Sequence, residues 1–433
     1  MRLYPAAIGG ALGAVALAAC VSDFFEDGRF TCESSPTCPP GLICASDKRC
    51  RAQEVTIADA AIDIEEPFPD SGTATPPDSC TSAAWTSQPT GRTASALAMS
   101  EDNKLYAGGS AGKRGWIAEI DTCTGGVVRE LLFDVQGSTD PVVQGIALSG
   151  TDLLVSGVVT VGGASEALYA RFSTKDFTRS AITTQPGAGI IGANHIAVRS
   201  DGTVFIGGAV HIFEATMTGW LIRIEKDAVK CQSFPASSIT AFFRDPAGEL
   251  LVVTNEADKS QRLSKTGDAC TTAQFGEALV FPNGTTGGSN GITGTIEQPI
   301  LVGGTGPAPG GNETGYIAVR NGSWTLFPQP DPNPQKIDHF LRAGTDGEAL
   351  FVASLQNATL TGGTPLLARY ALPLTPSSAP VWTTSAFGPA LAPVEAVLVG
   401  PKGSDAIFLA GTELPGRTKS AIARCRKATG CAQ

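Results

Sequence analysis

Short apolar segments recur at a regular interval throughout residues 80–433. Each copy has an apolar stretch, a polar turn rich in Gly, Asp or Asn, and a second apolar stretch that ends on a small residue. Seven copies align on this pattern, and their small residues are Gly108, Ser156, Gly207, Thr254, Gly303, Ala353 and Ala410. The pattern predicts pairs of β-strands joined by tight turns.

A third apolar stretch follows in most copies, as in WIAEI at 116–120 and WLIRI at 220–224. A period near fifty residues with three or four strands per unit is typical of a β-propeller, in which each blade buries a face against the next. We therefore predict an all-β protein with a seven-bladed β-propeller over residues 80–433. The small residues are expected where neighbouring blades converge, and Trp116 and Trp220 are expected to pack between blades.

One further strand-like stretch, CTSAAWTS at 80–87, precedes the first full repeat. It is similar in character to the segments that follow the third strand in other copies, such as CQSFPAS at 231–237. We therefore predict that it forms the outer strand of the last blade and joins the two ends of the propeller.

These repeats resemble the degenerate propeller repeats of secreted and surface proteins of bacteria. The Gly pair in several copies is also similar to that of kelch blades, although the Tyr and Trp positions of kelch blades are only partly present. The resemblance covers residues 80–433 through the pattern of strands and small residues. It implies the propeller fold and no particular activity.

The N-terminal region begins with a short positive start and an apolar run, LYPAAIGGALGAVALAA. This run is shorter than the ~20 residues of a membrane-spanning helix, so we interpret residues 1–19 as a signal peptide. Its end, LAAC, resembles the lipobox of bacterial lipoproteins. The resemblance implies that Cys20 carries lipid and anchors the mature protein to a membrane, the outer membrane because Val21 follows. The alternative is cleavage after Ala18 or Ala19 by an ordinary signal peptidase.

A cysteine-rich segment follows a spacer at residues 20–31. Its four cysteines recur every six residues, at Cys32, Cys38, Cys44 and Cys50. Residues 32–50 are too few to bury a core, so we predict a knot with two disulfides. Pairing of the first cysteine with the third, and of the second with the fourth, is preferred among three possibilities. A zinc site is the alternative, but the segment lacks the C-x2-C pair that zinc sites usually have.

The next segment, residues 51–79, is acidic and contains several prolines, so we predict a flexible linker. Six cysteines then remain in the propeller region, and an even number suits disulfides in an oxidising compartment. Adjacency favours three pairs, Cys80 with Cys123, Cys231 with Cys270, and Cys425 with Cys431. The alternative joins Cys80 to Cys431 across the closure of the ring.

The candidate chemistry is sparse. A formal net charge of −10 and the lack of a basic cluster argue against a nucleic-acid partner. The chain has three histidines, and His195 and His339 precede the first strand of the third and sixth repeats. They are expected at equivalent places near one mouth of the channel, far apart, as candidates for a binding or catalytic role.

No nucleophile, phosphate-binding or zinc-protease motif occurs, and no cofactor or metal is predicted. Two classes of function remain. The first is an envelope-anchored binding or scaffold module for a protein or glycan. The second is a secreted propeller enzyme, a lyase or hydrolase, with its site at the channel mouth. Three or more convergent His, Arg, Asp or Glu side chains in the channel would favour the enzyme.

Overall fold

The computed structural model describes residues 42–44, 50–52, 80, 84–186, 190–211, 217–233, 238–244, 250–256, 260–281, 285–307, 314–328, 337–359, 362–375, 378–387, 394–401, 403–412 and 420–431. The chain divides into two compact units, residues 1–61 and 62–433. In the first, β1 (Leu42–Cys44) and β2 (Cys50–Ala52) form an antiparallel hairpin in which Cys44 lies opposite Cys50. This hairpin extends two residues into the range predicted as a linker.

The described residues do not include the predicted signal peptide, most of the predicted linker, or Cys20, Cys32 and Cys38. The lipid anchor and the pairing within the knot therefore stay predictions. Within the part of the chain that the structure describes, no helix is long and apolar enough to cross a membrane.

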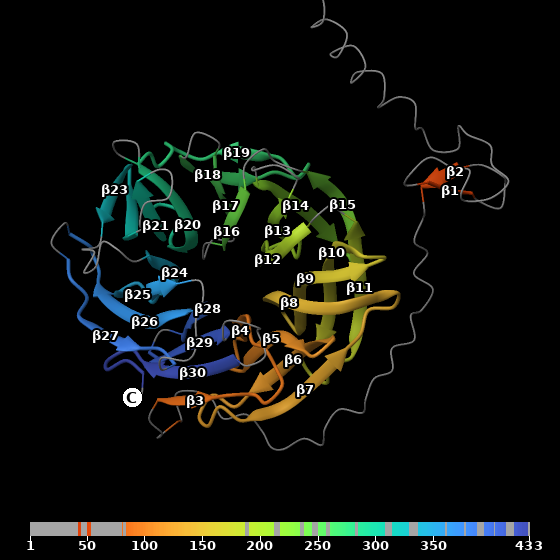
Figure 1. Cartoon of the computed structure of the whole chain (residues 1–433), viewed down its shortest axis with the longest axis horizontal. Helices are drawn as coiled ribbons and strands as arrows, with labels where there is room; N and C mark the ends of the chain where they lie inside the picture. The colour runs from red at the N-terminus through yellow and green to blue at the C-terminus, as the bar shows by residue number, and fades with distance from the viewer. Residues whose placement is uncertain are drawn as a thin grey trace, which may run out of the picture. The chain divides into compact units, whose positions relative to one another are not determined.

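Seven four-stranded antiparallel sheets form the second unit and surround a common axis (Figure 1). The innermost strands are β4 (Ala96–Met99), β8 (Ser138–Ser149), β12 (Ile190–Val198), β16 (Ser238–Arg244), β20 (Thr285–Gly294), β24 (Ile337–Thr345) and β28 (Val394–Val399). The second strands are β5 (Leu105–Ala111), β9 (Asp152–Val161), β13 (Val204–His211), β17 (Leu250–Asn255), β21 (Pro299–Pro307), β25 (Ala349–Thr359) and β29 (Ala406–Thr412).

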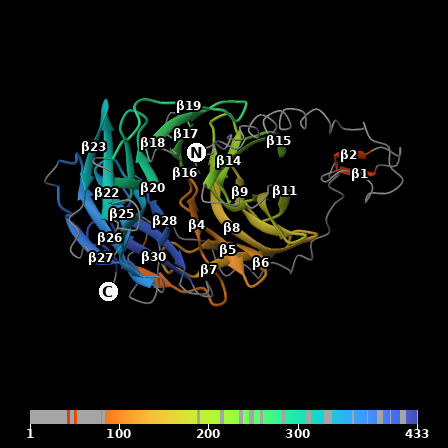
Figure 2. The ribbon, with the colours of Figure 1, turned by 45° about the horizontal axis from the view of Figure 1, so that its top comes forward.

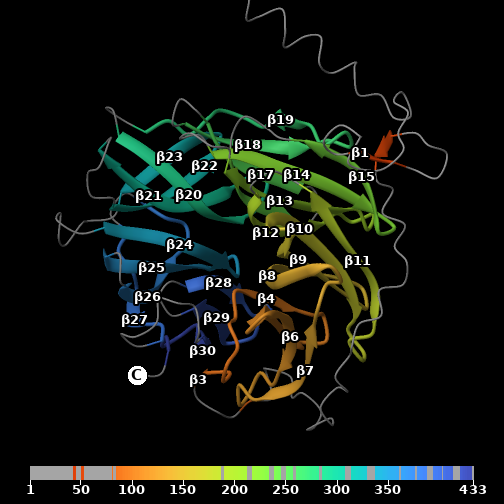
Figure 3. The ribbon, with the colours of Figure 1, turned by 45° about the vertical axis from the view of Figure 1, so that its right-hand side comes forward.

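The third strands are β6 (Arg114–Ile120), β10 (Ala164–Ser173), β14 (Met217–Glu225), β18 (Gln261–Thr266), β22 (Thr314–Asn321), β26 (Gly362–Ala371) and β30 (Ser420–Arg426). The outer strands are β7 (Val127–Phe133), β11 (Arg179–Pro186), β15 (Ala228–Ser233), β19 (Thr272–Gln274), β23 (Ser323–Pro328), β27 (Trp382–Ser385) and β3 (Trp85–Ser87). We number the blades 1 to 7 in chain order, so that blade 1 is β4–β7 and blade 7 is β28–β30 with β3. The order from axis to rim is visible for blades 2 and 3 in Figure 3. The predicted seven-bladed propeller is confirmed.

Closure of the ring follows the prediction from the sequence. Strand β3 pairs antiparallel with β30, with Trp85 opposite Arg424 and Ser87 opposite Ile422. Trp85 also packs near Phe408 of β29, with ring centroids 6.3 Å apart. The start and the end of the propeller therefore share one sheet, in which β30 is covered by β3 and is not left as the edge strand.

The blades pack through continuous apolar clusters. Blades 5 and 6 lie side by side in the tilted view of Figure 2. They share an apolar cluster that includes Phe340 of blade 6 and Ile317 of blade 5. Trp116 and Trp220 are fully buried, as predicted. At Gly108, an added Cβ would lie 2.6 Å from Val143 Cγ1 of the next blade. Gly108 and Gly207 are therefore required by the close approach of the next blade. The second strands β5, β9, β13, β21 and β25 nevertheless continue several residues beyond the small residue, which therefore does not end the strand as predicted.

Three disulfides occur in the propeller. Cys80–Cys123 joins the segment before β3 in blade 7 to the turn after β6 in blade 1, with the Cα atoms 5.2 Å apart. Cys231–Cys270 joins blades 3 and 4 in the same way, with 5.8 Å between the Cα atoms. Cys425–Cys431 lies within blade 7. These are the pairs favoured by adjacency, and the alternative pair of Cys80 with Cys431 is absent because each has another partner.

Candidate functional site

The innermost strands share an irregularity at one level. In six of the seven, the register with the second strand shifts by one residue at a β-bulge beside the small position. A bulge interrupts the ladder and redirects side chains. The polar residues at this level that have described side chains are all half-buried, and we call them the axial ring: Ser95, Gln144, His195, Thr240, Asn290, Arg342 and Glu395.

Three side chains of the axial ring, those of Ser95, Asn290 and Arg342, donate hydrogen bonds to carbonyl groups of the next blade. Ser95 Oγ of blade 1 donates to Val143 O of blade 2 at 2.7 Å. Asn290 Nδ2 of blade 5 donates to Phe340 O of blade 6 at 2.9 Å. Both carbonyl groups lie immediately before or at a bulge, where the regular ladder is interrupted. The ring therefore holds inner strands together where the sheet pattern cannot.

Arg342 makes the largest set of such contacts. Its Nε donates to Glu395 O of blade 7 at 2.8 Å. Its Nη1 donates to Asn290 O of blade 5 at 2.7 Å and to Leu341 O of its own blade at 2.8 Å. Burial lowers the pKa of Arg342, and the charge of Glu395 acts in the opposite direction. An arginine nevertheless stays charged in proteins, so a fixed cation lies at this level.

His195 occupies the position in blade 3 that Arg342 occupies in blade 6. His195 is paired with Gly207, and Arg342 with Ala353, the small residue of its blade. The imidazole lies edge-on to Phe242, with ring centroids 6.2 Å apart. Burial, and secondly the positive charge of Arg342, lower the pKa of His195 to about 3. The imidazole is therefore neutral at neutral pH.

His339 does not match His195, which corrects an expectation from the sequence. Both histidines lie inside the innermost strands β12 and β24 rather than before them. His339 is paired with Leu355, two residues beyond the small residue Ala353. Alignment of the letters HIAVR and HFLRA missed the bulge in β24 and the different lengths of the two hairpins.

The axial ring is better suited to holding a fixed polar surface than to proton transfer. A general base works best with a pKa near the working pH, and a pKa of about 3 makes His195 a weak base. The donors of Arg342 are largely used by main-chain carbonyl groups. Among the residues described, no three His, Cys, Asp or Glu side chains gather in a way that could hold a metal ion.

Two cavities open at the end of the propeller that carries the turns between first and second strands and between third and outer strands. The first, of about 490 Å³, lies between blades 6 and 7 and is lined mainly by charged or polar residues: Asp346, Glu348, Arg369, Gly403, Ser404, Asp405, Lys427 and Ala428. The second, of about 930 Å³, lies among blades 5, 6 and 7 and has a more apolar lining that includes Ile300, Val319, Phe327, Leu372 and Val399. Asp346 lines both.

A network of ion pairs surrounds the polar cavity. Lys427 Nζ lies 3.2 Å from Asp346 Oδ2 and also donates to Gly400 O at 3.2 Å. Burial opposes ionisation of Asp346, but hydrogen bonds from two backbone N–H groups and from Lys427 outweigh it and lower the pKa. Asp405 Oδ2 lies 2.6 Å from Arg426 Nε. Two of the three carboxylates of the cavity are therefore paired with cations of the chain.

Sequence reasoning missed Arg342, Asn290, Glu395 and Arg369. The first three stand 11 to 15 residues before the small residue of their copy, and counting back from that residue would have placed them beside the axis. The local sequence carries no pattern that predicts the positions of the bulges. Arg369 lies within the apolar third-strand segment LLARY at 366–370, and nothing in that segment distinguishes it from a strand that only packs in the core.

Comparison with known proteins adds little beyond the fold. No protein-family model matches the sequence, and no curated protein matches it. Among solved structures, a catalytically inactive virginiamycin B lyase from Staphylococcus aureus is similar with 12% identity and a TM-score of 0.46, over 78% of this chain and 99% of that one. The Cps50 (Swd1) propeller domain of Myceliophteria thermophila is similar with 13% identity and a TM-score of 0.46, over 78% and 99%. The Dos1 propeller has 8% identity and a TM-score of 0.45, over 79% and 94%.

Proposed function

We propose that the protein is an envelope-anchored lipoprotein whose propeller binds a protein or a glycan. The two adjoining cavities among blades 5, 6 and 7 carry the binding part of this proposal. Their volumes of about 490 and 930 Å³ fall in the range of ligand sites, and a mainly apolar lining beside a few placed polar groups is typical of such sites. The lipobox-like LAAC and the disulfides support an envelope location.

The second candidate is a secreted propeller lyase or hydrolase that works at the axial ring. One observation favours it: the positive charge of Arg342 acts on His195, and Arg342 Nε donates to the main-chain oxygen of Glu395, so three titratable residues interact at this level. The low pKa of His195 and the carbonyl contacts of Arg342 make a binding role the better supported of the two.

Membrane attachment depends on Cys20 in this proposal. Cys20→Ala should move the protein from the membrane fraction to the soluble fraction or leave it unprocessed, because no lipid can then be attached. Cell fractionation and metabolic labelling with a fatty acid measure this. Cys44→Ala serves as the control and should stay membrane-bound. A Cys20→Ala protein that still fractionates with membranes, from a parent that takes up no label, would contradict the anchor.

Binding at the cavities is tested with the immobilised full chain and envelope extract separated into protein and glycan fractions. One fraction should be retained, and Thr325→Trp should reduce retention at least fivefold. Thr325 is exposed at the rim of the larger cavity, so an indole there fills space without disturbing the core. Thr325→Ser is the matched control and should behave as the parent. The cavity is rejected as a binding site if Thr325→Trp and Thr325→Ser retain equal amounts of envelope material, or if the parent retains neither the protein nor the glycan fraction.

A further inference from the structure

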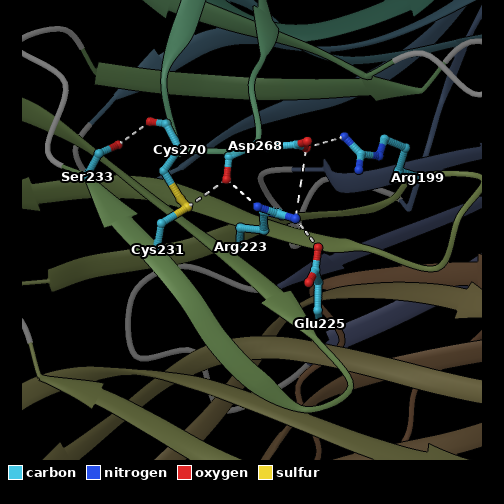
Figure 4. The surroundings of a disulfide bond; sticks show 7 residues. All are labelled: Arg199, Arg223, Glu225, Cys231, Ser233, Asp268 and Cys270. Carbon is cyan, nitrogen blue, oxygen red and sulfur yellow. Dashed lines mark hydrogen bonds and ion pairs between the residues drawn. A yellow bond between two sulfur atoms is a disulfide. The ribbon is translucent and has the colours of Figure 1, made fainter.

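The third strands of blades 2 and 3 carry an arginine at the same position, and each arginine forms an ion pair with an aspartate of the next blade. Arg171 Nε of blade 2 lies 2.8 Å from Asp227 Oδ1 in the third-to-outer turn of blade 3. Arg223 of blade 3 contacts Asp268 in the same turn of blade 4, donating to its carbonyl oxygen and lying 4.0 Å from its carboxylate (Figure 4). Each arginine therefore has a carboxylate supplied by its neighbour.

Both arginines also have a carboxylate within their own blade. Arg171 Nη1 lies 2.8 Å from Asp152, at the start of the second strand. Arg223 is paired with Glu225, two residues further along the same strand. The cation of each is thus neutralised from two sides, and these contacts link blades 2, 3 and 4 near the rim.

Arg369 of blade 6 holds the same strand position but lacks every one of these partners. It is opposite Phe351, as Arg171 is opposite Leu154. Ala349 of blade 6 is at the position that Asp152 has in blade 2, two residues before the residue opposite the arginine. Ala371 of blade 6 is at the position that Glu225 has in blade 3, two residues after the arginine.

Blade 7, which follows blade 6, also lacks the aspartate that blades 3 and 4 carry in the turn after the third strand. Asp227 follows Arg223 by four residues, and Asp268 follows Ser264, the equivalent residue of blade 4, by four. In blade 7, the residue four places after Arg424 is Ala428. Within the described part of the chain, the side chain of Arg369 makes no hydrogen bond or ion pair, and its Nε is buried.

The missing carboxylate coincides with a cavity. The opening of about 490 Å³ between blades 6 and 7 is lined by both Arg369 and Ala428. Among the described residues of the lining, Asp346 and Asp405 are paired with Lys427 and Arg426, which leaves the Arg369 cation and the exposed carboxylate of Glu348. A half-buried arginine without a counter-ion is poorly solvated, so an external anion in its place is favourable.

We propose that this cavity binds an acidic sugar, with the sugar carboxylate on Arg369. A planar guanidinium recognises a carboxylate through two parallel, charge-assisted hydrogen bonds, whereas the hydroxyl groups of a neutral sugar accept only weaker hydrogen bonds without the opposite charge. Glu348 and Ser404 are then available for the sugar hydroxyl groups, which donate and accept hydrogen bonds. The mainly polar lining suits a sugar better than an aliphatic acid. This inference rests on the proposed binding of a glycan and names its class.

The test measures binding of glucuronate, glucose and acetate to the full chain by isothermal titration calorimetry. Glucuronate should bind at least tenfold more tightly than glucose or acetate. Arg369→Gln should weaken glucuronate at least tenfold, because the charged fork is lost. Arg171→Gln is the matched control, since its partners are internal, and it should bind as the parent does.

Ala428→Asp provides a second variant that needs no loss of the arginine. It places a carboxylate at the turn position of Asp227 and Asp268, and residue 428 is exposed, so folding is preserved. This internal carboxylate should compete with glucuronate and weaken it at least tenfold, whereas Ala428→Asn should not.

Either of two results overturns the inference: glucuronate that binds no better than acetate, or Arg369→Gln that binds as the parent does. The outcome is separable from the proposed function. Envelope material retained by the larger cavity, together with absent glucuronate binding, would reject the acidic-sugar site alone. Absence of both would reject the binding module as well.

Discussion

A chain that lacks residues 80–90 should unfold at a temperature lower by roughly 10 °C or more. The deletion removes β3, so that β30 becomes an exposed edge. It also removes Trp85, whose Nε1 donates to Thr122 O of blade 1 at 3.0 Å, and the Cys80–Cys123 disulfide. Trp85 is half-buried, so its loss costs less than the about 3 to 5 kcal/mol of a fully buried tryptophan, and loss of a disulfide costs about 2 to 4 kcal/mol.

Differential scanning calorimetry on the deleted and parent chains measures this effect. The double variant Cys80→Ser, Cys123→Ser is the control, because it loses the disulfide but keeps the strand, and it should lose less than half as much in melting temperature. An unfolding curve unchanged by the deletion would show that β3 does not close the ring.

Arg342→Leu should lower the free energy of unfolding by about 3 kcal/mol or more, because three main-chain carbonyl groups lose a charged donor. The same change should raise the pKa of His195 from about 3 towards its ordinary value, since the positive charge opposite it is removed. Burial remains and keeps the pKa of His195 below that ordinary value. Urea unfolding measures the first effect, and NMR titration of the imidazole signals measures the second.

Arg342→Lys separates the two effects. An ammonium group keeps the positive charge but cannot reproduce the fork of donors, so stability should fall while the pKa of His195 stays low. If Arg342→Lys and Arg342→Leu move the pKa of His195 equally, the charge of Arg342 is not what acts on the imidazole. His195→Gln identifies the signal among the three histidines.

The architecture was predictable because its determinants are local and repeated. Small residues such as Gly108 and Ala410 must recur wherever two blades converge, and their spacing reports the period directly. The outer strand at Trp85 was recognisable because it is similar to segments elsewhere in the repeat. The disulfide pairs followed from the equivalent turns in which Cys123 and Cys270 lie.

The candidate sites were less accessible because they depend on differences between copies. The bulge before Arg342 shifts the register by one residue, and apolar letters alone do not reveal such a shift. Arg369 differs from Arg171 and Arg223 because blade 7 has Ala428 where blades 3 and 4 have an aspartate. This difference can be recognised only once the ion pairs of Arg171 and Arg223 are known from the structure.

The Cys80–Cys123 disulfide has a consequence for the order of biosynthesis. The partner strand of β3 is the last strand of the propeller in chain order, so β3 stays unpaired until blades 1 to 6 have been synthesised. Cys123 follows Cys80 by only 43 residues, so in the exported protein that we propose the two thiols can be oxidised before the later blades are complete. The bond then keeps β3 beside blade 1 and spares the chain most of the entropy cost of closing a very long loop. If the chain is exported as we propose, the ring therefore closes when β30, synthesised late, pairs with β3, which the disulfide already holds beside blade 1.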